Sequence, residues 1–451
     1  MIMLLWPQHF EVALKRLSRS RLARGVGANS YSQIVAVAIQ LVQVPCLLLA
    51  WGSETFGLWL LVSTMPAYLA LADFGFSVTS ANEMTMATAR HAYDEAIGIF
   101  QSVMALNCLI AFGLSTIILL ITLVLPDAVF PHTASISVGT VKAILLLLTL
   151  HVLAIMCSEA FFGAFQSSGH YSLSVFLAST ARLFEASALL ATAVLTRSVL
   201  PAMAAMFAVR LFTILCTGLI LKRVAPWLKY GFAHSSIREV RRLSKPAIAV
   251  MVLPAAFAAS LQGQVLVIGY TLSLNAVAIF SSVRTLTRAV IQAAAIVNHA
   301  IMPEVTRAVA SEDQLRLKRL LKLNLASVCT INLATFVVVV TLGERLISLW
   351  TQGRITVDWK LLVGLAGVAA LHSLWLSYSN LILAVNKSGW YSYWFLGVSL
   401  ASTGSSIPFT RYLGLDGILW PLLAAEVMMI VVVTRAFRSV YRLPIPQQAR
   451  S

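Results

Sequence analysis

The sequence VAIFSSVRTLTRAVIQAAAIVNHAIM, residues 277–302, is mainly apolar but carries a row of four long or ionisable polar side chains. They are spaced by four, four and seven residues: Arg284, Arg288, Gln292 and His299. Such spacings place all four on one face of a helix, where the row covers roughly 22 Å, most of the hydrocarbon thickness of a bilayer. Two arginines at that depth need an anionic partner or water, so we expect the row to line a substrate pathway.

The composition of the whole chain places this stretch in a membrane. The 451 residues are 59% hydrophobic and 11% charged, whereas soluble domains contain about 25% charged residues. Windows of about 20 apolar residues predict an all-α, polytopic membrane protein with twelve transmembrane helices. The predicted spans are 27–50, 57–78, 101–125, 142–165, 172–195, 199–221, 247–270, 277–302, 323–342, 361–383, 391–409 and 417–434.

The distribution of Lys and Arg predicts the orientation of the chain. With the N-terminus inside, the cytoplasmic segments hold 23 of the 33 Lys and Arg residues, and the outer segments hold six. Because basic residues are retained in cytoplasmic loops, we expect both termini in the cytoplasm. The formal charge of +16 then reflects attraction to anionic headgroups, and nucleic-acid binding is not needed to explain it. Residues 1–26 are predicted to form an amphipathic segment in the inner membrane interface.

Weak internal similarity predicts that the twelve spans form two halves. The chain can be aligned with itself without gaps so that Gln43 falls on Gln264, and we call this shift the repeat offset. It also places Glu83 on Glu304. In both halves a basic run, a span with a glutamine, a short outer loop and a span that ends near an inner glutamate follow in the same order. Because six is even, both six-helix halves start on the same side, as parallel pseudo-symmetric repeats around a central cleft that we expect to hold the substrate. The predicted parts are the halves 27–221 and 247–434, the basic cytoplasmic linker 222–246 and the cytoplasmic tail 435–451.

Other ionisable residues inside the spans have two interpretations each. Arg182 and Glu185 are three residues apart, close enough to pair on one helix face, which we favour. Arg210 has no acid on its own span, so it either pairs across helices or faces the cleft. Glu159 and Glu426 are candidates for proton uptake, because burial favours the neutral carboxyl, or they serve as counterions of the arginines. Glu185 is a third candidate for ion coupling.

The first two spans contain polar groups of the same ambiguous kind. Asp73 lies in the run LADFGF, residues 71–76, where glycine and the nearby Pro66 predict a broken or bent span. This aspartate either caps a helix end or binds a coupling ion. In span one, Gln33 and Gln40 lie on one face with Asn29, and such amides either hold helices together or contact sugar hydroxyls in a cleft.

Metal and nucleotide chemistry find no support in the sequence. The five cysteines, all inside predicted spans, lack the spacing of a metal site or a disulfide framework, and the chain has no glycine–lysine phosphate loop. We therefore expect no metal site and no cofactor beyond possible coupling to H⁺ or Na⁺. Directionality must come from an ion gradient, from consumption of the product or from a partner.

Several segments resemble the polysaccharide and O-antigen flippases of the multidrug/oligosaccharidyl-lipid/polysaccharide (MOP) exporter superfamily. In the first half these are FGLWLLVST at 56–64, LADFGF at 71–76 and ANEM at 81–84, and the similarity extends over essentially the whole chain. In the second half they are FSSVRTLTR at 280–288 and NHAIMPE at 298–304.

The resemblance implies a function. Such proteins move an undecaprenyl-diphosphate-linked oligosaccharide from the inner to the outer leaflet of a bacterial cytoplasmic membrane. Arginines in their central cavity are thought to attract the diphosphate and acidic sugars, a role that we carry onto Arg284 and Arg288. The expected partners are the lipid-linked oligosaccharide, membrane lipids, and polysaccharide polymerases and glycosyltransferases. The further predicted substrate contacts are Gln292, His299, Arg210, Gln33 and Gln40.

Three other functions compete with this one. A multidrug cation antiporter of the same superfamily would share the fold, but organic cations require acids where this chain has a basic row. A general twelve-span facilitator is expected to carry a Gly- and Arg-rich loop after span two, and residues 82–90 do not match it. A membrane polysaccharide polymerase or ligase usually needs a sizeable catalytic outer loop, whereas the predicted outer loops are short. We therefore expect a transporter and not an enzyme.

Overall fold

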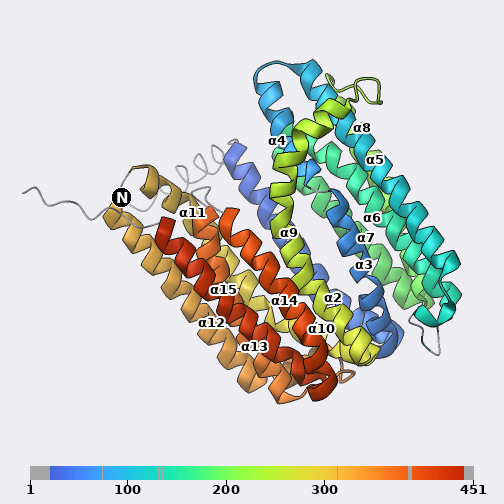
Figure 1. Ribbon diagram of the computed structural model, residues 1–451, viewed down its shortest axis with the longest axis vertical. Helices are drawn as coiled ribbons and strands as arrows, with labels where there is room; N and C mark the ends of the chain where they lie inside the picture. The colour runs from blue at the N-terminus through green and yellow to red at the C-terminus, as the bar shows by residue number, and fades with distance from the viewer. Residues whose placement is uncertain are drawn as a thin grey trace, which may run out of the picture. The chain divides into compact units, whose positions relative to one another are not determined.

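The computed structural model describes residues 21–73, 75–130, 133, 136–311, 313–383 and 389–440. This part of the chain is almost entirely helical (Figure 1), with one isolated β-bridge between Thr133 and Ile136. Ten stretches within it are long and apolar enough to cross a membrane, so the predicted all-α, multi-pass fold is confirmed. Most of the predicted amphipathic segment 1–26 and of the tail 435–451 lies outside the described residues.

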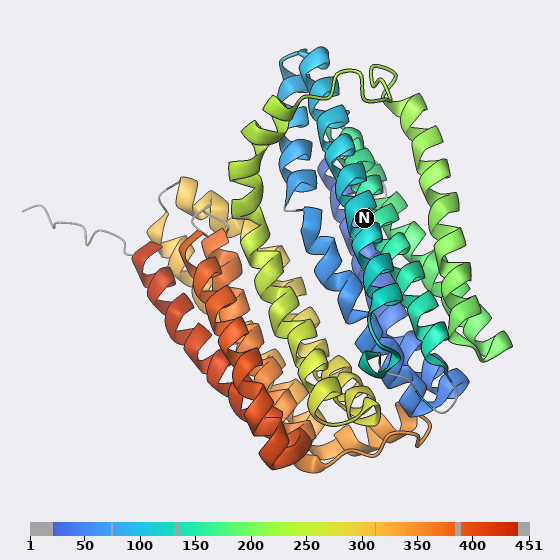
Figure 2. The same cartoon turned by 45° about the vertical axis from the view of Figure 1, so that its right-hand side comes forward.

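Helix contacts divide the chain into two compact units. The first unit contains Met1–Trp51 and Tyr68–Met251, and the second contains Gly52–Ala67 and Val252–Ser451. The segment α2 (Arg21–Val62) consists of two helices joined by a kink at Gly52, where φ is 77° and ψ is 172°, and the part from Gly52 onward belongs to the second unit. The predicted halves 27–221 and 247–434 place this part in the first half. Each unit is a bundle of long helices (Figure 2).

The helices follow one another in a simple order. The α-helices are α2 (Arg21–Val62), α3 (Thr64–Leu69), α4 (Phe76–Ala89), α5 (Tyr93–Val124), α6 (Val138–Ser167), α7 (Tyr171–Thr196), α8 (Val199–Val224), α9 (Ile237–Thr271), α10 (Leu274–Thr287), α11 (Ala289–Ala310), α12 (Gln314–Trp350), α13 (Trp359–Leu383), α14 (Gly389–Leu413) and α15 (Leu419–Val440). Short 3₁₀ helices are η1 (Ala70–Asp73), η2 (Asp127–Val129) and η3 (Gly414–Ile418).

The helix starts follow the repeat offset found in the sequence. The offset that places Gln43 on Gln264 also places Tyr93, the first residue of α5, on Gln314, the first residue of α12. It likewise places the start of α6 on the start of α13, and the starts of α8 and α15 agree with it to within a single position. Equivalent positions in the two units can therefore be compared through this offset.

The predicted span 57–78 is interrupted, as the sequence predicts. The chain passes here from α2 through α3 and η1 into α4, with Gly75 in the left-handed region at φ 75°. A Cβ at this position would lie 2.4 Å from the carbonyl oxygen of Ala247, so only glycine fits. The predicted break is confirmed, and Asp73 caps the following helix, because its carboxylate accepts from the Ser77 N–H at 3.1 Å and from the Ser77 hydroxyl at 2.8 Å.

The predicted span 277–302 is also interrupted. Helix α10 ends at Thr287 and α11 begins at Ala289, with Arg288 between them at φ −72° and ψ −7°. Each of the other ten predicted spans corresponds to a helix. The last two spans correspond to α14 and α15, which both lie within the single apolar stretch Tyr391–Ser439. The two interrupted spans are the ones that carry Asp73 and the predicted basic row.

Small residues bring the helices of each unit close together. In the first unit, a Cβ on Gly163 of α6 would lie 3.2 Å from the Cβ of Ala81 on α4. In the second unit, a Cβ on Gly263 of α9 would lie 2.7 Å from the side chain of Thr403 on α14. Such close approaches supply van der Waals contact where lipid removes the hydrophobic driving force between helices. The polar cavities described below lie within these two packed units.

Candidate functional site

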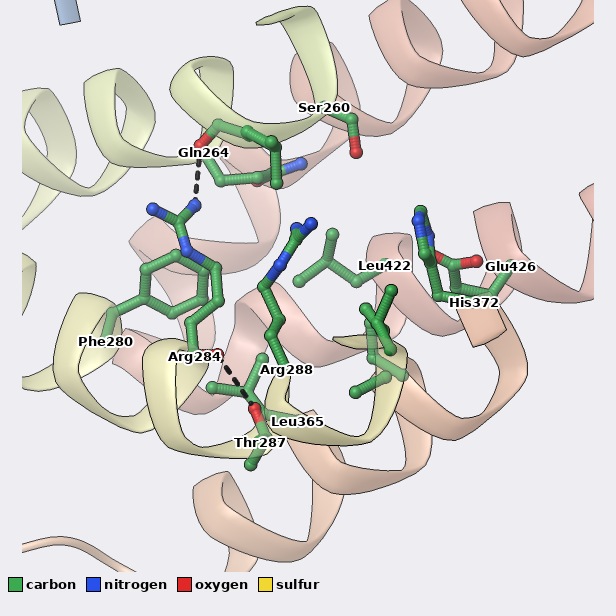
Figure 3. A pocket seen from close by; sticks show the side chains of 14 residues that line it. Ser260, Gln264, Phe280, Arg284, Thr287, Arg288, Leu365, His372, Leu422 and Glu426 are labelled. Carbon is green, nitrogen blue, oxygen red and sulfur yellow. Dashed lines mark hydrogen bonds and ion pairs between the residues drawn. The ribbon is translucent and has the colours of Figure 1, made fainter. Parts of the chain in front are cut away.

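A small polar cavity, here called the basic pocket, lies inside the second unit. Its volume is about 40 Å³ and its walls come from α9, α10, α11, α13 and α15 (Figure 3). A cavity of this size holds a few water molecules. The polar residues that line it are Ser260, Gln264, Arg284, Thr287, Arg288, His372 and Glu426. The predicted basic row therefore contributes its two arginines to one internal pocket.

Arg284 is held in place by two contacts. Its Nη1 donates a hydrogen bond of 2.6 Å to the carbonyl oxygen of Leu261 on α9, and its guanidinium lies 5.1 Å from the centre of the Phe280 ring. The hydrogen bond uses one of the five N–H donors of the guanidinium. The side chain is thus fixed in position while most of its donors stay available.

Arg288 occupies the junction between α10 and α11. Its guanidinium points into the basic pocket, between Gln264 and the pair formed by His372 and Glu426 (Figure 3). Within the described residues, its side chain makes no hydrogen bond and no ion pair of 4.0 Å or less. A guanidinium without a partner in a largely apolar setting is costly unless water or a ligand solvates it.

Glu426 is already bound by two other donors. The Trp375 Nε1–H donates to its Oε2 at 2.5 Å, and His372 Nδ1 lies 3.0 Å from its Oε1. The Glu426 residue is only 7% exposed. With a neutral histidine, this cluster and the two arginines leave the pocket with a net positive charge. The arrangement suits a ligand that is an anion with several oxygen acceptors.

A larger cavity, here called the mixed cavity, lies inside the first unit. Its volume is about 630 Å³, within the range of about 300–1,000 Å³ typical of small-molecule sites. Both charge signs and several neutral hydrogen-bonding groups line it: Ser77, Asn82, Glu159, Gln166, Tyr171, Ser174, Arg182, Glu185 and Arg210. Helices α4, α6, α7 and α8 contribute these residues.

The buried charges of this cavity do not pair as the sequence predicts. Glu185 is 5% exposed and contacts Arg210 Nη2 at 2.8 Å and His151 Nε2 at 3.3 Å. Arg182 donates instead to the Ser32 hydroxyl of α2 at 3.3 Å. The expected pair of Arg182 and Glu185 is therefore wrong. Glu185 faces α6 and α8, where a buried partner is at hand, whereas Arg182 is exposed. Arg210 both pairs across helices and lines the cavity.

Glu159 is the carboxylate that the mixed cavity leaves accessible. Its side chain is exposed in a cavity that it lines, and it makes no hydrogen bond within the described part of the chain. The charges that act on it electrostatically are those of Asp73, Arg210 and Arg182. Of the four predicted coupling acids, Asp73 caps a helix and Glu185 and Glu426 are held by neighbouring donors, so Glu159 is the one that makes neither a hydrogen bond nor an ion pair among the described contacts.

The other predicted contact residues lie elsewhere. Gln292 is in α11 and does not line the basic pocket, although its neighbour Ile291 does. Gln33 is exposed and Gln40 half-buried on α2, and neither lines the two cavities. The side chain of His299 lies outside the described residues. For these four residues, a role in substrate binding stays a prediction.

The sequence does not identify the partners of His151 and His372, two lone histidines on apolar helices, where most such residues are structural donors. His151 and His372 had no obvious partner along their own helices, yet each contacts a buried glutamate. The repeat offset places one on the other and was the signal available to find them. Among the described residues, no group of three or more His, Cys, Asp or Glu side chains is arranged to hold a metal ion.

Comparison with solved structures identifies the fold. An inward-facing multidrug resistance MATE family transporter of the MOP superfamily matches with a TM-score of 0.70 at 14% identity, over 92% of this chain and 96% of that chain. An outward-facing MATE family transporter matches with a TM-score of 0.63 at 15% identity, over 94% and 96% of the two chains. The chain therefore has the fold of MATE transporters of the MOP superfamily.

A third structure has a related fold and a different pocket. It is a MOP superfamily transporter from Pyrococcus furiosus, described as having a binding pocket of reverse polarity that suggests a different function. It matches with a TM-score of 0.58 at 13% identity, over 92% of this chain and 93% of that chain. No protein-family model and no curated protein sequence matches the chain.

Proposed function

We propose that this chain is a membrane transporter that moves an undecaprenyl-diphosphate-linked oligosaccharide across the bacterial cytoplasmic membrane by alternating access. The observation that carries the proposal is the basic pocket, in which Arg284 and Arg288 have no carboxylate within ion-pair distance among the described residues. The fold, shared with MATE transporters of the MOP superfamily, supports transport. A neighbour described with reverse pocket polarity shows that this fold accommodates pockets of different charge.

The chemistry of the cargo matches the arginines. A diphosphate cannot cross hydrocarbon unaided, because each unsatisfied polar group costs several kcal/mol there. The planar fork of a guanidinium donates two parallel hydrogen bonds to phosphate oxygens, and these bonds are stronger than neutral ones. The pocket of about 40 Å³ is too small for a sugar. In this proposal it takes only diphosphate oxygens and is wider in the loaded state.

The mixed cavity has the size and the groups for the polar parts of a glycan. Asn82, Gln166 and Tyr171 line it, and amides and hydroxyls of this kind both donate to and accept from sugar hydroxyls. We assign ion coupling, to H⁺ or Na⁺, to Glu159, because it is the predicted coupling acid without a hydrogen bond in the described residues. Both termini lie in the cytoplasm in this proposal, as the basic loops predict, and the partners are polysaccharide polymerases and glycosyltransferases.

A multidrug antiporter is the second candidate, and a specific observation favours it. The accessible carboxylate of Glu159 in a cavity of 630 Å³ is suited to an organic cation, and the structural neighbours include MATE family transporters described as multidrug resistance proteins. The two candidates differ in the groups on which they depend. The flippase needs the two arginines of the basic pocket, whereas the antiporter needs only the carboxylate of Glu159 in the mixed cavity, which the flippase uses for ion coupling.

The test is to compare lipid extracts and drug susceptibility in cells with and without the gene. Accumulation of a complete undecaprenyl-linked repeat unit on the cytoplasmic side, with unchanged drug tolerance, supports the flippase. Normal glycolipid with increased drug sensitivity supports the antiporter and overturns the flippase proposal.

Single variants sharpen the same comparison. Arg288→Ala should abolish export and Arg288→Lys should keep part of it, with equal amounts of folded protein. Arg345→Ala removes an exposed arginine of α12 and serves as the matched control. If the protein expels cations, Arg288→Ala should leave drug tolerance unchanged and Glu159→Gln should abolish it. The Arg288 variant separates the candidates, because Glu159 is also the coupling acid assigned to the flippase.

A further inference from the structure

A third cavity opens between α12, α13 and α15 of the second unit. It has a volume of about 150 Å³, and α13 packs against both of the other helices (Figure 1). We call it the α12 groove and define it by Lys322, Asn324, Leu325, Val328, Tyr378 and Phe437. Neither arginine of the basic pocket lines it, so it is a separate site.

The groove contains a buried amide that lacks a partner. Asn324 is 2% exposed, and its Oδ1 has no hydrogen-bond partner. Its Nδ2 donates no hydrogen bond within the described residues either. Buried polar atoms are nearly always hydrogen-bonded, and a side chain that is only 2% exposed has almost no access to bulk water that could replace the missing partner. The amide lines the groove, so a molecule in the groove can supply both a donor and an acceptor.

The rim of the groove is positively charged. Lys322 is exposed and lines the groove, and Arg438 of α15 is exposed beside the lining residue Phe437. Arg438 is close enough to interact electrostatically with the hydroxyl of Tyr378. Neither cation has an ion-pair partner in the described part of the chain, and no acidic residue lines the groove. The charge of the rim is therefore complementary to an anion.

The polar and apolar parts of the groove are arranged along the membrane normal. Lys322 comes directly before the predicted span 323–342, at the level of the headgroups. Leu325 and Val328 lie about one and two turns deeper on α12, at about 1.5 Å per residue. An occupant must therefore combine an anionic group at the interface with an apolar chain below it, and membrane phospholipids have this form.

We propose that the α12 groove binds a phospholipid with an anionic headgroup that carries a hydroxyl, as in phosphatidylglycerol. The phosphate lies between Lys322 and Arg438, and the Asn324 Nδ2–H donates to a phosphate oxygen. The headgroup hydroxyl donates to Asn324 Oδ1, and one acyl chain runs along Leu325 and Val328. This site binds a lipid of the surrounding bilayer, so the inference does not depend on which cargo the protein transports.

Native mass spectrometry of the purified full-length protein tests the proposal. The protein is incubated with phosphatidylglycerol or with phosphatidylcholine of the same acyl chains, and retained lipid is counted. Wild type should retain one phosphatidylglycerol in preference to phosphatidylcholine. Lys322→Gln should weaken this binding about fivefold, the effect of one basic residue near a membrane surface. Arg319→Gln removes a neighbouring exposed charge that does not line the groove and should change little.

Two further experiments distinguish lipid binding in the α12 groove from a general attraction of the protein to negatively charged lipids. Asn324→Leu fills the site with an apolar side chain and should weaken phosphatidylglycerol binding. If the leucine variant does not fold, Asn324→Ser is used instead and should also weaken the binding. Glycerol 1-phosphate, which lacks acyl chains, should not displace the lipid. Equal retention of both lipids, equal losses in Lys322→Gln and Arg319→Gln, or displacement by glycerol 1-phosphate would each overturn the proposal. Because no transport is measured, the outcome is independent of the proposed function.

Discussion

The two units each contain a buried histidine that contacts a buried glutamate, and they use that glutamate differently. His151 of α6 and His372 of α13 occupy equivalent positions under the repeat offset. In the first unit, Glu185 of α7 binds Arg210, whose Nη2 lies 2.8 Å from Oε1 and 2.9 Å from Oε2. In the second unit, Glu426 of α15 is bound by the neutral indole N–H of Trp375.

The difference determines which arginine can receive a ligand. In the first unit Glu185 neutralises Arg210, which lines the mixed cavity, and a role of this arginine in substrate binding stays a prediction. In the second unit the glutamate is satisfied by hydrogen-bond donors, so Arg288 keeps its charge and its donors for the basic pocket. A charged residue in a membrane helix is therefore not by itself a site. Its unused donors are the feature that identifies one.

Breaking the ion pair of Arg210 and Glu185 should produce the largest loss of stability. Arg210→Ala leaves Glu185 buried without its cation, which typically costs about 3–5 kcal/mol. We expect a large loss of thermal stability in detergent and a reduced yield of folded protein. The double variant Arg210→Met with Glu185→Leu removes both charges and should recover much of the loss. An unchanged melting temperature for Arg210→Ala would show that the pair contributes little.

Removing each histidine in turn sharpens the comparison. His372→Ala takes away one of two donors of Glu426, with no arginine to replace it, and should cost about 1–3 kcal/mol. His151→Ala should cost less, about 1 kcal/mol, because Arg210 still binds both oxygens of Glu185. The melting temperatures of both variants, measured under the same conditions, check whether His372→Ala loses more stability than His151→Ala. A larger loss for His151→Ala would contradict the assignment of the two glutamates.

Neutralising the glutamate of the second unit should strengthen anion binding. Glu426→Gln keeps an acceptor for Trp375 but removes a negative charge that acts on Arg288. We expect a short-chain polyprenyl diphosphate to bind roughly tenfold more tightly, a change of about 1.4 kcal/mol. Tryptophan fluorescence titration measures the affinity, because Trp375 contacts the substituted residue. Unchanged or weaker binding would mean that the ligand does not enter this pocket.

The smallest effect is expected for the arginine that does not pair with Glu185. Arg182→Ala removes a hydrogen bond of 3.3 Å to Ser32 from an exposed side chain, which should cost about 0.5–1 kcal/mol. Its melting temperature should therefore stay close to that of wild type, in contrast to Arg210→Ala. A loss as large as that of Arg210→Ala would restore the pairing of Arg182 with Glu185.

Much of the fold could be predicted from the sequence because hydropathy reports what a bilayer requires. Ten of the twelve predicted spans each have a helix, and the repeat offset fixes which helices correspond. The two interrupted spans are harder to predict from the sequence. The break near Asp73 was predicted from Gly75 and Pro66, whereas the break at Arg288 has no glycine or proline beside it.

The site was predictable only where local spacing decides the contacts. Arg284 and Arg288 are one turn apart and reach the same pocket, but Gln292, one turn further along, does not line it, although Ile291 beside it does. The partner of Glu185 depends on how α6, α7 and α8 pack, and a spacing of three residues on one helix carries no information about that packing. The binding of Glu426 by Trp375 and His372 requires the same tertiary knowledge.

The junction at Arg288 has a mechanical consequence. Helix α10 ends one residue before this arginine and α11 begins one residue after it, so a change in the angle between the two helices displaces the guanidinium. The position of the Arg288 charge therefore depends on the angle between α10 and α11. By thermodynamic reciprocity, an anion that favours one position of this charge also favours one angle, and a force on α11 alters the affinity for the anion.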